Sequence, residues 1–522
     1  MSLDARDFGS DHGWLAQDPV TRQSRIRPDT LAAQEFATGR ALTYRQLDAE
    51  VRRCETVLRE LVPAGGRVAL LARNSLRHIV LFYGCPRAGT VFQPLNWRLS
   101  GGELAVLLAD ASPDLVIYDA EFEKEAQAAL TAMPDVRRFK IAPGADPFAD
   151  LLAAAEPHPP TPVDPDAPAV LLYTSGTTGK PKGVIITPKS ATYGSLNFVF
   201  VGELTAGHAQ LCDPPFFHIV GLLASIHASL LAGATLHIPD RFTPPVTLQR
   251  LADPALAISH YFCVPQMAQA LLDDPGFADV ELSGLRLFTG GAPMPAHLTL
   301  RLCDAGIRAS NGYGMSENGT VMGVPLDIET ARRKAGSAGV AAPLMEVRIV
   351  RPDGEDAADG EVGEIWLRGP AITPGYWNQS ATTAKVFAGD WFRTGDAALR
   401  DAEGYYFIVD RWKDMYISGG ENVYPAEVEA VLSEMDGVAE VAVIGVDDQR
   451  WGEVGCAYLV LRGDAACDAS IVQTWCAERL ARYKHPTHLR FLETLPRTAS
   501  GKVQKDLLRR AFAAEAQTES PS

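Results

Sequence analysis

The stretch VLLYTSGTTGKPKG, residues 170–183, carries the strongest local signal in the chain. An apolar strand over 170–174 runs directly into a loop that is rich in glycine, hydroxyl side chains and lysine. Glycine permits unusual backbone angles and close approach of a ligand, and backbone amides with hydroxyl and lysine donors can hold phosphate groups. The donors are Thr174, Ser175, Thr177, Thr178, Lys180 and Lys182, with Gly176, Gly179 and Gly183 between them.

Two other interpretations of this loop have to be weighed. It is not a Walker A loop, because Gly176 and Gly179 are only three positions apart and Pro181 follows Lys180 where serine or threonine is required. By composition alone, an ordinary flexible surface loop explains it equally well. The remainder of the chain has to decide between a surface loop and a phosphate site.

Strand-like apolar runs alternate with helical ones on both sides of this stretch. Runs at 68–72 and 115–119 flank a helical segment that starts at Ser75, and the rhythm resumes after the loop. This alternation predicts an α/β fold with two sheet layers. From about 335 to 410 the runs become short and are separated by Gly, Pro and Asp, which predicts antiparallel strands or a small β-barrel.

The last hundred or so residues predict a separate, smaller α+β unit. We therefore expect an N-terminal domain over 1–410, made of two α/β layers plus the small barrel, and a C-terminal domain over 411–522. The tail from about Glu515 shows no apolar periodicity, so we expect no regular structure there.

Composition excludes several functional classes. The chain has 522 residues, 47% hydrophobic and 21% charged, which is the range of a multidomain globular protein. A net charge of −16 argues against a nucleic-acid partner, since such binding needs clustered Lys and Arg. Eight scattered cysteines without a CxxC pair predict reduced thiols and a cytoplasmic location, and the acidic N-terminus does not resemble a signal peptide.

The longest apolar stretch, 220–238, is interrupted by serine and histidine. A core helix running into a strand explains it better than a transmembrane segment. Peripheral association with a membrane through an apolar patch remains open at this point.

The loop at 173–183 closely resembles the signature loop of the adenylate-forming (ANL) superfamily, which includes the acyl-CoA synthetases and other AMP-dependent synthetases and ligases. Further motifs match that family in the family's order over residues 173–505. They are Phe216-Phe-His218, Asn311-Gly-Tyr-Gly-Met-Ser-Glu317, Trp391-Phe-Arg-Thr-Gly-Asp396, Asp410-Arg-Trp-Lys413 with Gly419-Gly-Glu-Asn-Val-Tyr-Pro425, and Pro496-Arg-Thr-Ala-Ser-Gly-Lys502. An ordered set of this kind is highly specific.

The resemblance implies a two-step reaction that uses ATP, Mg²⁺ and a thiol. A carboxylate attacks the α-phosphate of ATP to give an acyl-adenylate and pyrophosphate, and the thiol then takes the acyl group. Such chemistry needs positioning and charge neutralisation more than a protein nucleophile. The implied acceptor is coenzyme A, with the phosphopantetheine arm of an acyl carrier protein as the alternative.

The resemblance also implies roles for individual residues. Lys502 would hold the carboxylate and α-phosphate oxygens, and Glu317, with Thr174, would contact magnesium. Asp396 and Arg411 would bind the ribose, and Tyr313 would stack on adenine. The remaining nucleotide contacts would come from Ser175, Gly176, Thr177, Thr178, Gly179, Lys180, Gly291, Ala292, Asn311, Gly314 and Ser316.

In the family the C-terminal domain is mobile and rotates between the two half-reactions. Lys413 matches the hinge position of that rotation. Gly419 and Gly420 would line the pantetheine tunnel, and His218 matches an aromatic position that gates the acyl pocket. The residues implied to contact coenzyme A are Trp451, Tyr483 and His485, although His485 is less reliably charged than the arginine of some relatives.

The expected class of acid follows from the charged residues that the candidate pocket lacks. Phe217 stands where amino-acid-activating relatives carry an aspartate for the substrate ammonium, which argues against an amino acid. The candidate pocket segments are 288–292, 313–319 and the helix over 220–229. They carry no Arg or Lys to meet a second carboxylate, and burying a carboxylate without a partner costs several kcal/mol. We therefore expect a hydrophobic monocarboxylic acid, with space for its tail at His218, Gly290, Gly291, Gly314 and Gly319.

Two further functional classes compete with a ligase. One is a non-catalytic adenylate-binding protein, against which the joint presence of Lys502, Glu317, Asp396 and Arg411 argues. The other is a luciferase-like oxygenase, which would share fold and adenylation and which only an oxygen-dependent product distinguishes. A homodimer fits the habit of the family, and the sequence does not decide it.

Overall fold

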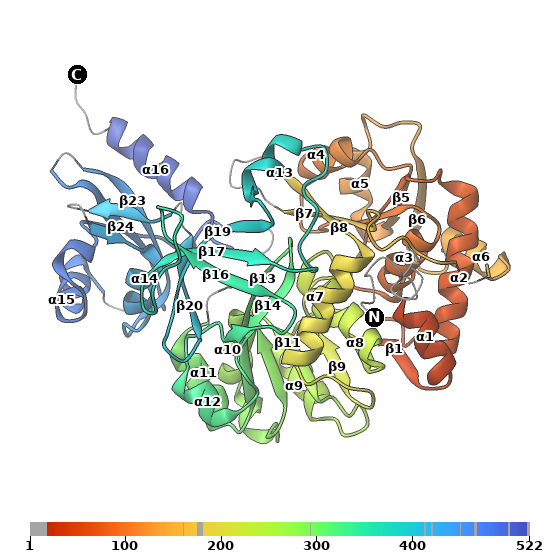
Figure 1. Ribbon diagram of the computed structural model, residues 1–522, viewed down its shortest axis with the longest axis horizontal. Coiled ribbons are helices and arrows are strands. Elements are labelled where there is room, and N and C mark those ends of the chain that lie inside the picture. Colours follow the sequence, from red (N-terminus) through yellow and green to blue (C-terminus); the bar gives the residue numbers. More distant parts are fainter. Residues whose placement is uncertain are drawn as a thin grey trace, which may run out of the picture. The chain divides into compact units, whose positions relative to one another are not determined.

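The computed structural model describes residues 18–159, 161–174, 181–292, 294–411, 414–418, 421–448, 450–463, 467–498 and 502–518. By its contacts the chain divides into two units, residues 1–346 with 367–392 and residues 347–366 with 393–522. The helices and strands of both units are labelled in Figure 1.

The first unit contains a six-stranded sheet in which every neighbouring pair is parallel except the last, β7 with β8. In sheet order the strands are β6 (Arg137–Ile141), β5 (Leu115–Asp119), β3 (Arg67–Leu71), β4 (Val91–Pro94), β7 (Val170–Thr174) and β8 (Lys182–Ile186). The flanking helices are α2 (Tyr44–Leu61), α3 (Leu76–Arg87), α4 (Gly101–Ala111), α5 (Glu123–Ala129) and α6 (Pro147–Ala154). These strands and helices confirm the predicted alternation.

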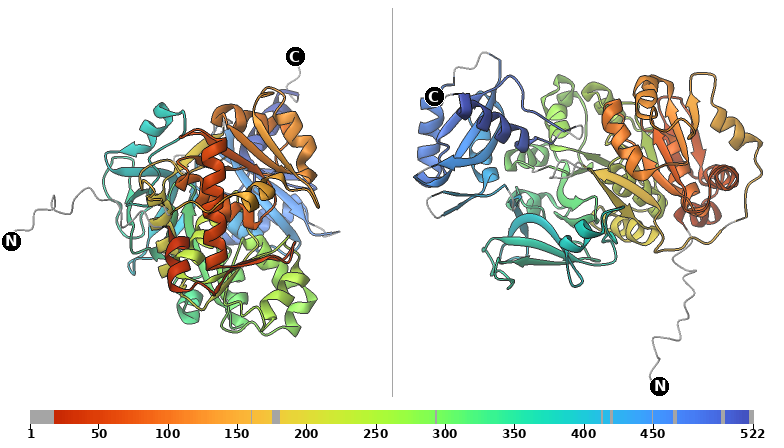
Figure 2. Two further views of the ribbon diagram at one scale, coloured as in Figure 1. Left: turned by 90° about the vertical axis from the view of Figure 1, so that its right-hand side faces the viewer. Right: turned by 90° about the horizontal axis from the view of Figure 1, so that it is seen from above.

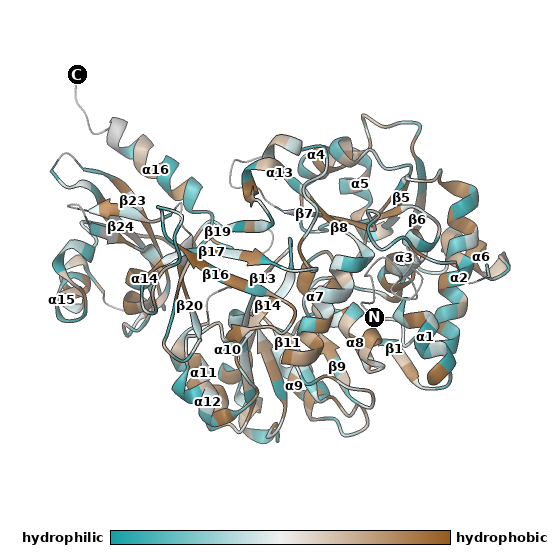
Figure 3. Cartoon of the chain, viewed as in Figure 1, coloured by the Kyte–Doolittle hydropathy of each residue, from teal (hydrophilic) through white to brown (hydrophobic). Residues whose placement is uncertain are grey.

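Helix α2 shows why these segments fold locally as they do. Thr43 caps its start, since Gln46 N donates to Thr43 Oγ1 (3.3 Å) and Thr43 N donates to Gln46 Oε1 (2.8 Å). Leu47, Val51, Cys54 and Leu58 then recur every three or four residues and are buried. Figure 2 (left) brings α2 to the front, and Figure 3 shows polar and apolar residues alternating along it.

The same unit contains a nine-stranded sheet with a parallel centre and antiparallel edges. In sheet order the strands are β15 (Val340–Ala341), β14 (Gly319–Gly323), β13 (Arg308–Met315), β12 (Arg286–Thr289), β11 (His260–Cys263), β9 (Ala209–Cys212), β10 (Thr235–Ile238), β1 (Leu31–Glu35) and β2 (Ala41–Thr43). Its helices are α1 (Pro19–Ile26), α7 (Pro188–Val201), α8 (Ala228–Ala232), α9 (Pro244–Ala252), α10 (Pro265–Asp273), α11 (Ala296–Asp304) and α12 (Ile328–Arg333).

The core lies between these layers. One apolar cluster contains residues of the six-stranded sheet, of α2 and α3, and of the segment from Phe216 to Leu230, so it joins the two sheets. A second cluster packs α9, α10 and α11 on the other face of the nine-stranded sheet, around Tyr261 and Leu287.

The apolar stretch 220–238 forms a helix followed by a strand, as expected. Its first eight residues, Val220–His227, are a π-helix that continues into α8 before β10 begins. The π form was not predicted. Helices of this type are rare overall, and many of those that do occur lie at functional sites. No helix among the described residues is long and apolar enough to cross a membrane.

Residues 346–411 form a five-stranded sheet with α13 (Ser380–Val386). The order is β16 (Glu346–Val350), β17 (Gly363–Arg368), β19 (Trp391–Arg400) and β18 (Phe387–Ala388), and β20 (Tyr406–Arg411) also pairs with β19. The antiparallel strands expected here are confirmed where their pairing is given, β18 with β19 and β19 with β20. The described strands do not clearly close into a barrel.

The second unit contains a further five-stranded sheet. Its order is β22 (Glu421–Val423), β21 (Tyr416–Ser418), β24 (Gly452–Leu461) and β23 (Val438–Asp448), with β25 (His488–Phe491) parallel to β24. Its helices are α14 (Pro425–Ser433), α15 (Ala469–Arg479) and α16 (Lys505–Thr518). Helix α16 extends past Glu515, so the expected irregular tail was wrong for residues 515–518.

Candidate active site

The glycine-rich loop connects two antiparallel strands, β7 and β8. Thr174, the last residue of β7, pairs with Lys182, the first residue of β8. Tyr173, one residue earlier, donates its hydroxyl to Asp110 Oδ2 at 2.6 Å, and burial together with this carboxylate raises the pKa of Tyr173 well above its ordinary value. The predicted phosphate-binding residues Ser175, Gly176, Thr177, Thr178, Gly179 and Lys180 lie outside the described residues.

The strands of the nine-stranded sheet place several predicted residues along one edge. β9, β11 and β12 are parallel, and their register aligns Cys212 with Phe262 and Cys263 with Thr289. The segments that follow their carboxyl ends therefore start at the same edge, where open α/β sheets bind ligands. His218 follows β9 there, and Gly290, Gly291 and Ala292 follow β12.

Strand β13 continues past this edge and turns back into β14. Asn311 ends the parallel pairing with β12, and its amide bridges Thr289 Oγ1 (3.3 Å) and the carbonyl of Ser337 (2.7 Å). Beyond it, the antiparallel hairpin with β14 carries Tyr313, Gly314 and Ser316. The hairpin presents these residues next to the Gly290 segment.

The glycines of this region are used in different ways. A Cβ on Gly314 would lie 2.0 Å from Gly319 O, and a Cβ on Gly319 would lie 3.2 Å from the Cα of Gly194. A Cβ on Gly290 would lie 3.2 Å from the Phe262 ring, whereas Gly291, at φ +81°, has nothing within 4 Å. Gly314 and Gly319 thus permit close backbone packing, and open space is found at Gly291. Their predicted role in the acyl pocket stays a prediction.

Glu317 lies in the turn between β13 and β14 and is 8% exposed. Tyr376, 6% exposed, donates its hydroxyl to Glu317 Oε1 at 2.9 Å, and Thr373 N donates to Glu317 O at 2.7 Å. No cluster of three or more His, Cys, Asp or Glu side chains that would hold a metal ion occurs among the described residues. A single buried carboxylate fits Mg²⁺ bound together with nucleotide phosphates, which usually takes one or two protein carboxylates.

The segment that carries His218 is held by Asn74. The Asn74 amide donates to Pro214 O (2.9 Å) and accepts from Phe216 N (2.8 Å), so one side chain fixes both ends of this turn. His218 packs against Phe217, with ring centroids 4.6 Å apart. Asn74 follows β3 of the six-stranded sheet, so the turn is anchored across the two sheets.

The π-helix beside this turn carries a buried polar pair. His227 Nδ1 lies 2.8 Å from the Tyr83 hydroxyl, and Nε2 lies 3.5 Å from Thr192 Oγ1 on α7. Burial lowers the pKa of His227 to about 4, so the imidazole is neutral near pH 7. The segment that we expected to line the acyl pocket therefore carries no charge at its histidine.

In the second unit, strand pairing brings the two predicted ribose residues together. Asp396 on β19 pairs directly with Arg411 on β20, although they are fifteen positions apart in the chain. Asp396 is 7% exposed, and its backbone N–H donates to Thr394 Oγ1 at 3.1 Å. This register places the two positions opposite each other on neighbouring strands.

Lys502 lies on a short hairpin turn of the second unit. Thr498 N donates to Lys502 O (2.7 Å), and Lys502 N donates to Thr498 Oγ1 (3.1 Å). Arg497 and Val503 form an isolated antiparallel β-bridge next to these bonds. The turn presents Lys502 as an exposed residue. Its role in adenylate formation stays a prediction.

Trp451, a predicted coenzyme A residue, immediately precedes β24, and the predicted residues Tyr483 and His485 precede the neighbouring strand β25. Trp451 is 48% exposed. Ser418, the residue before Gly419 and Gly420, pairs with Gly452. Thr487 N donates to Gly455 O (2.8 Å), which continues the parallel pairing of β24 with β25.

Tyr483 lies in the short helix Arg482–Lys484 before β25 and is 38% exposed. His485 is held by its own backbone, since His485 Nε2 lies 2.9 Å from Leu480 O. Gly419, Gly420 and the hinge position Lys413 lie outside the described residues.

Comparison with protein families identifies the family of the chain. The family model for AMP-binding enzymes matches residues 20–377, and the model for the AMP-binding enzyme C-terminal domain matches residues 427–502. The chain belongs to the AMP-binding enzymes of the adenylate-forming superfamily. The predicted family is thereby confirmed.

Several relatives of the chain are named as CoA ligases or CoA synthases. A feruloyl-CoA synthase of Amycolatopsis sp is 39% identical over 95% of this chain and 99% of its own. The long-chain-fatty-acid–CoA ligase FadD13 of Mycobacterium tuberculosis is 36% identical over 96% and 98%. ATP-bound MatB from Rhodopseudomonas palustris superimposes with a TM-score of 0.86 at 30% identity, covering 95% and 98%.

The chain is accordingly an AMP-forming acid–thiol ligase, a class that uses ATP and coenzyme A. Sequence reasoning missed Tyr376 and Asn74, which contact the predicted residues Glu317 and the His218 turn. Asn74 did carry a signal, because it directly follows a predicted strand and polar residues at that edge commonly serve a site. Tyr376 carried none, because it lies outside every motif that the sequence analysis singled out.

Proposed function

We propose that this ligase activates a hydrophobic monocarboxylic acid and transfers its acyl group to coenzyme A. The acid's carboxylate oxygen attacks the α-phosphorus of ATP, and pyrophosphate leaves. The coenzyme A thiol then attacks the acyl carbonyl, and AMP leaves with the electrons of the broken C–O bond. The products are acyl-CoA, AMP and pyrophosphate.

The observation that carries the choice of acid is the charge pattern of the elements around His218 and Gly290. α7, β12 and β13 carry one basic residue each, and each of these forms an ion pair. Lys189 on α7 pairs with Asp166 at 3.3 Å. Arg286 on β12 and Arg308 on β13 both pair with Glu203, at 3.6 and 3.9 Å. Arg286 and Arg308 begin their strands, at the edge opposite the one from which the site segments emerge.

The π-helix adds only apolar or weakly polar side chains and the neutral His227. A second carboxylate would therefore be buried without a partner here, at a cost of several kcal/mol. The names of two relatives support the same class, since one is a feruloyl-CoA synthase and the other a long-chain-fatty-acid–CoA ligase.

For the first half-reaction, we assign the charge-neutralising role to Lys502, which would meet the carboxylate and α-phosphate oxygens. Glu317, with Thr174, would hold Mg²⁺, which when bound neutralises phosphate charge. Asp396 and Arg411 would bind the ribose and Tyr313 the adenine. The phosphate and nucleotide contacts would come from Ser175 to Lys180 and from Gly291, Ala292, Asn311, Gly314 and Ser316.

For the second half-reaction, we assign the acceptor site to the start of β24. Trp451 and Tyr483 offer exposed rings for the adenine of coenzyme A, and His485 a polar edge beside them. Gly419 and Gly420 would line the path of the pantetheine arm, and rotation at Lys413 would exchange Lys502 for this face. His218 would gate the acyl site between the two steps.

The test is pyrophosphate release with ATP and Mg²⁺ across fatty, aryl, polycyclic and dicarboxylic acids, with and without coenzyme A, and with products identified by mass. We expect acyl-CoA from one or a few hydrophobic monocarboxylic acids. Preference for a dicarboxylic acid would contradict the proposed acid class. Acyl-adenylate that is transferred to an acyl carrier protein but not to coenzyme A would contradict the proposed acceptor.

A further inference from the structure

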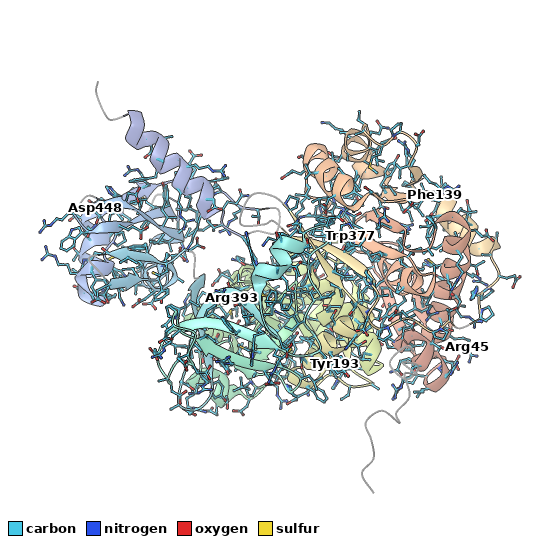
Figure 4. The ribbon with its side chains drawn as sticks, turned by 45° about the horizontal axis from the view of Figure 1, so that its top comes forward. Arg45, Phe139, Tyr193, Trp377, Arg393 and Asp448 are labelled. Carbon is cyan, nitrogen blue, oxygen red and sulfur yellow. The ribbon has the colours of Figure 1, made fainter. Side chains whose placement is uncertain are left out.

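Residues 373–379 run along β8 and hold it from outside the sheet. Ile185 N donates to Gly375 O (3.1 Å) and Trp377 N donates to Gly183 O (2.7 Å). The Gln379 side chain adds a hydrogen bond from Nε2 to Pro181 O (3.1 Å). Figure 4 labels Trp377 at this place. The segment therefore behaves as an added edge strand on the strand that leaves the glycine-rich loop.

The same segment holds Glu317. Thr373 N binds the Glu317 carbonyl, and the Tyr376 hydroxyl binds the Glu317 carboxylate at 2.9 Å. The side chains of Glu317 and Tyr376 are both almost completely buried. A hydrogen bond to an ionised carboxylate in such surroundings is stronger than one between neutral groups, and it limits the directions in which the carboxylate can point.

The ring of Tyr376 contacts the loop side as well. Lys182 Nζ lies 4.9 Å from the centre of the ring, within the range of a cation–π interaction. Lys182 is also the residue that pairs with Thr174 across the base of the loop. One tyrosine thus touches the carboxylate with its hydroxyl and the lysine beside the loop with its ring.

We propose that Tyr376 is a positioning residue that orients Glu317 toward the metal–nucleotide complex and couples it to the base of the glycine-rich loop. This inference rests on the proposed role of Glu317 as the magnesium contact. In this proposal Tyr376 acts through its contacts with Glu317 and Lys182.

A tyrosine that only fills the core needs no such partner. Tyr44 shows the difference within the same unit: it is fully buried, and its hydroxyl donates to a backbone carbonyl, Ala234 O, at 2.6 Å. A backbone carbonyl satisfies a buried hydroxyl equally well. Tyr44→Phe is therefore the matched control for Tyr376→Phe, because each variant loses one buried hydroxyl.

The experiment measures ATP affinity by titration calorimetry at a series of buffered free Mg²⁺ concentrations, with neither acid nor coenzyme A present. For Tyr376→Phe we expect the Mg²⁺ concentration at half-effect to rise about tenfold, the size typical of losing a partner of a metal-binding carboxylate. At saturating Mg²⁺ the ATP affinity should stay within about twofold of wild type, since the ring over Lys182 is kept. Tyr44→Phe should lower the unfolding temperature and leave the Mg²⁺ dependence unchanged.

A double-mutant cycle with Glu317→Gln separates this inference from the role of Glu317 itself. We expect Glu317→Gln to shift the Mg²⁺ dependence, and Tyr376→Phe to add less than about twofold in that background. If Glu317→Gln shifts it and Tyr376→Phe alone does not, or if Tyr376→Phe adds its full shift to Glu317→Gln, the positioning role is refuted while Glu317 keeps its own. If Glu317→Gln has no effect, the metal role of Glu317 falls, and the positioning role with it.

Discussion

Asp213 is a carboxyl group held inside the protein next to the His218 turn. Oδ2 accepts from the Tyr261 hydroxyl (2.8 Å) and from Thr247 Oγ1 (3.3 Å), whereas Oδ1 is buried and has no hydrogen-bond partner among the described residues. Burial raises the pKa of Asp213 to about 6, although Arg250 acts in the opposite direction. The carboxylate form is therefore unfavourable in the folded protein.

We predict that the stability of Asp213→Asn relative to wild type increases as the pH rises from about 4 to above 6. Between an ordinary pKa of 3.8 and the folded value of about 6, the folded state binds more protons than the unfolded one, so wild-type stability falls as the pH rises through this range. The asparagine does not titrate. Its stability relative to wild type should rise by up to about 3 kcal/mol between pH 4 and pH 7.

Urea unfolding of both proteins at several pH values between 4 and 8 measures this difference. A difference in unfolding free energy that stays constant across the range would show that the carboxyl of Asp213 does not carry a raised pKa.

At the level of single residues, the motifs named candidate side chains but not the contacts that hold them. Glu317, Asp396 and Lys502 could be named because their neighbours in the sequence form recognisable patterns. The hydroxyl that donates to the Glu317 carboxylate belongs to Tyr376, 59 positions away. No pattern within one segment contains such a pair. Contacts of this kind depend on the tertiary packing of segments that only the fold brings together.

Among the elements, the turn that carries His218 depends on one side chain of the other sheet. Asn74 binds Pro214 O and Phe216 N at once, and Phe216 is fully buried in the core that joins the two sheets. The position of His218 is thus set by the carboxyl end of β3 as well as by β9.

We predict that Asn74→Ala destabilises the protein by about 2–3 kcal/mol, because it leaves a buried donor and a buried acceptor unpaired. It should also raise the KM for the acid more than it lowers kcat, since the turn that gates the acyl site loses its anchor. Thermal unfolding and steady-state kinetics with the preferred acid give both values. Asn74→Asp keeps only the acceptor for Phe216 N, so its stability should lie between those of wild type and Asn74→Ala. If both variants lose the same stability and neither changes the KM, Asn74 does not position His218.

The π-helix shows why element type is harder to predict than element position. The stretch 220–238 predicted a helix followed by a strand, and both occur. Its helical part is apolar nearly all round, so no period of hydrophobic residues distinguishes a π-helix from an α-helix. The register of β19 with β20 was also inaccessible, since the pairing of Asp396 with Arg411 includes a bulge next to it.

At the scale of the whole molecule, the family motifs divide between the two units. Thr174, His218 and Glu317 belong to the first unit, and Asp396, Trp451 and Lys502 to the second. We propose that the C-terminal domain, predicted to begin near residue 411, turns about Lys413 between the half-reactions. A single acyl site then meets Lys502 in one step and the coenzyme A residues in the other.

We predict that Lys413→Pro blocks one of the two half-reactions and spares the other. Proline fixes φ near −65° and removes a backbone N–H, so it restricts rotation at this position. The two half-reactions are measured separately, by pyrophosphate release without coenzyme A and by thioester formation from supplied acyl-adenylate. Wild-type rates in both would show that Lys413 is not the hinge.

The central claim is that the two half-reactions use different residues of the same mobile domain, and Lys502→Ala tests it most directly. Both half-reactions are to be measured on this one variant, with the acid that the wild-type enzyme prefers. We predict that adenylate formation falls by about 10²- to 10³-fold or more, because a positioned positive charge is lost where phosphate charge develops. Thioester formation from supplied acyl-adenylate should remain within a few-fold of wild type. An equal loss in both half-reactions would contradict the account.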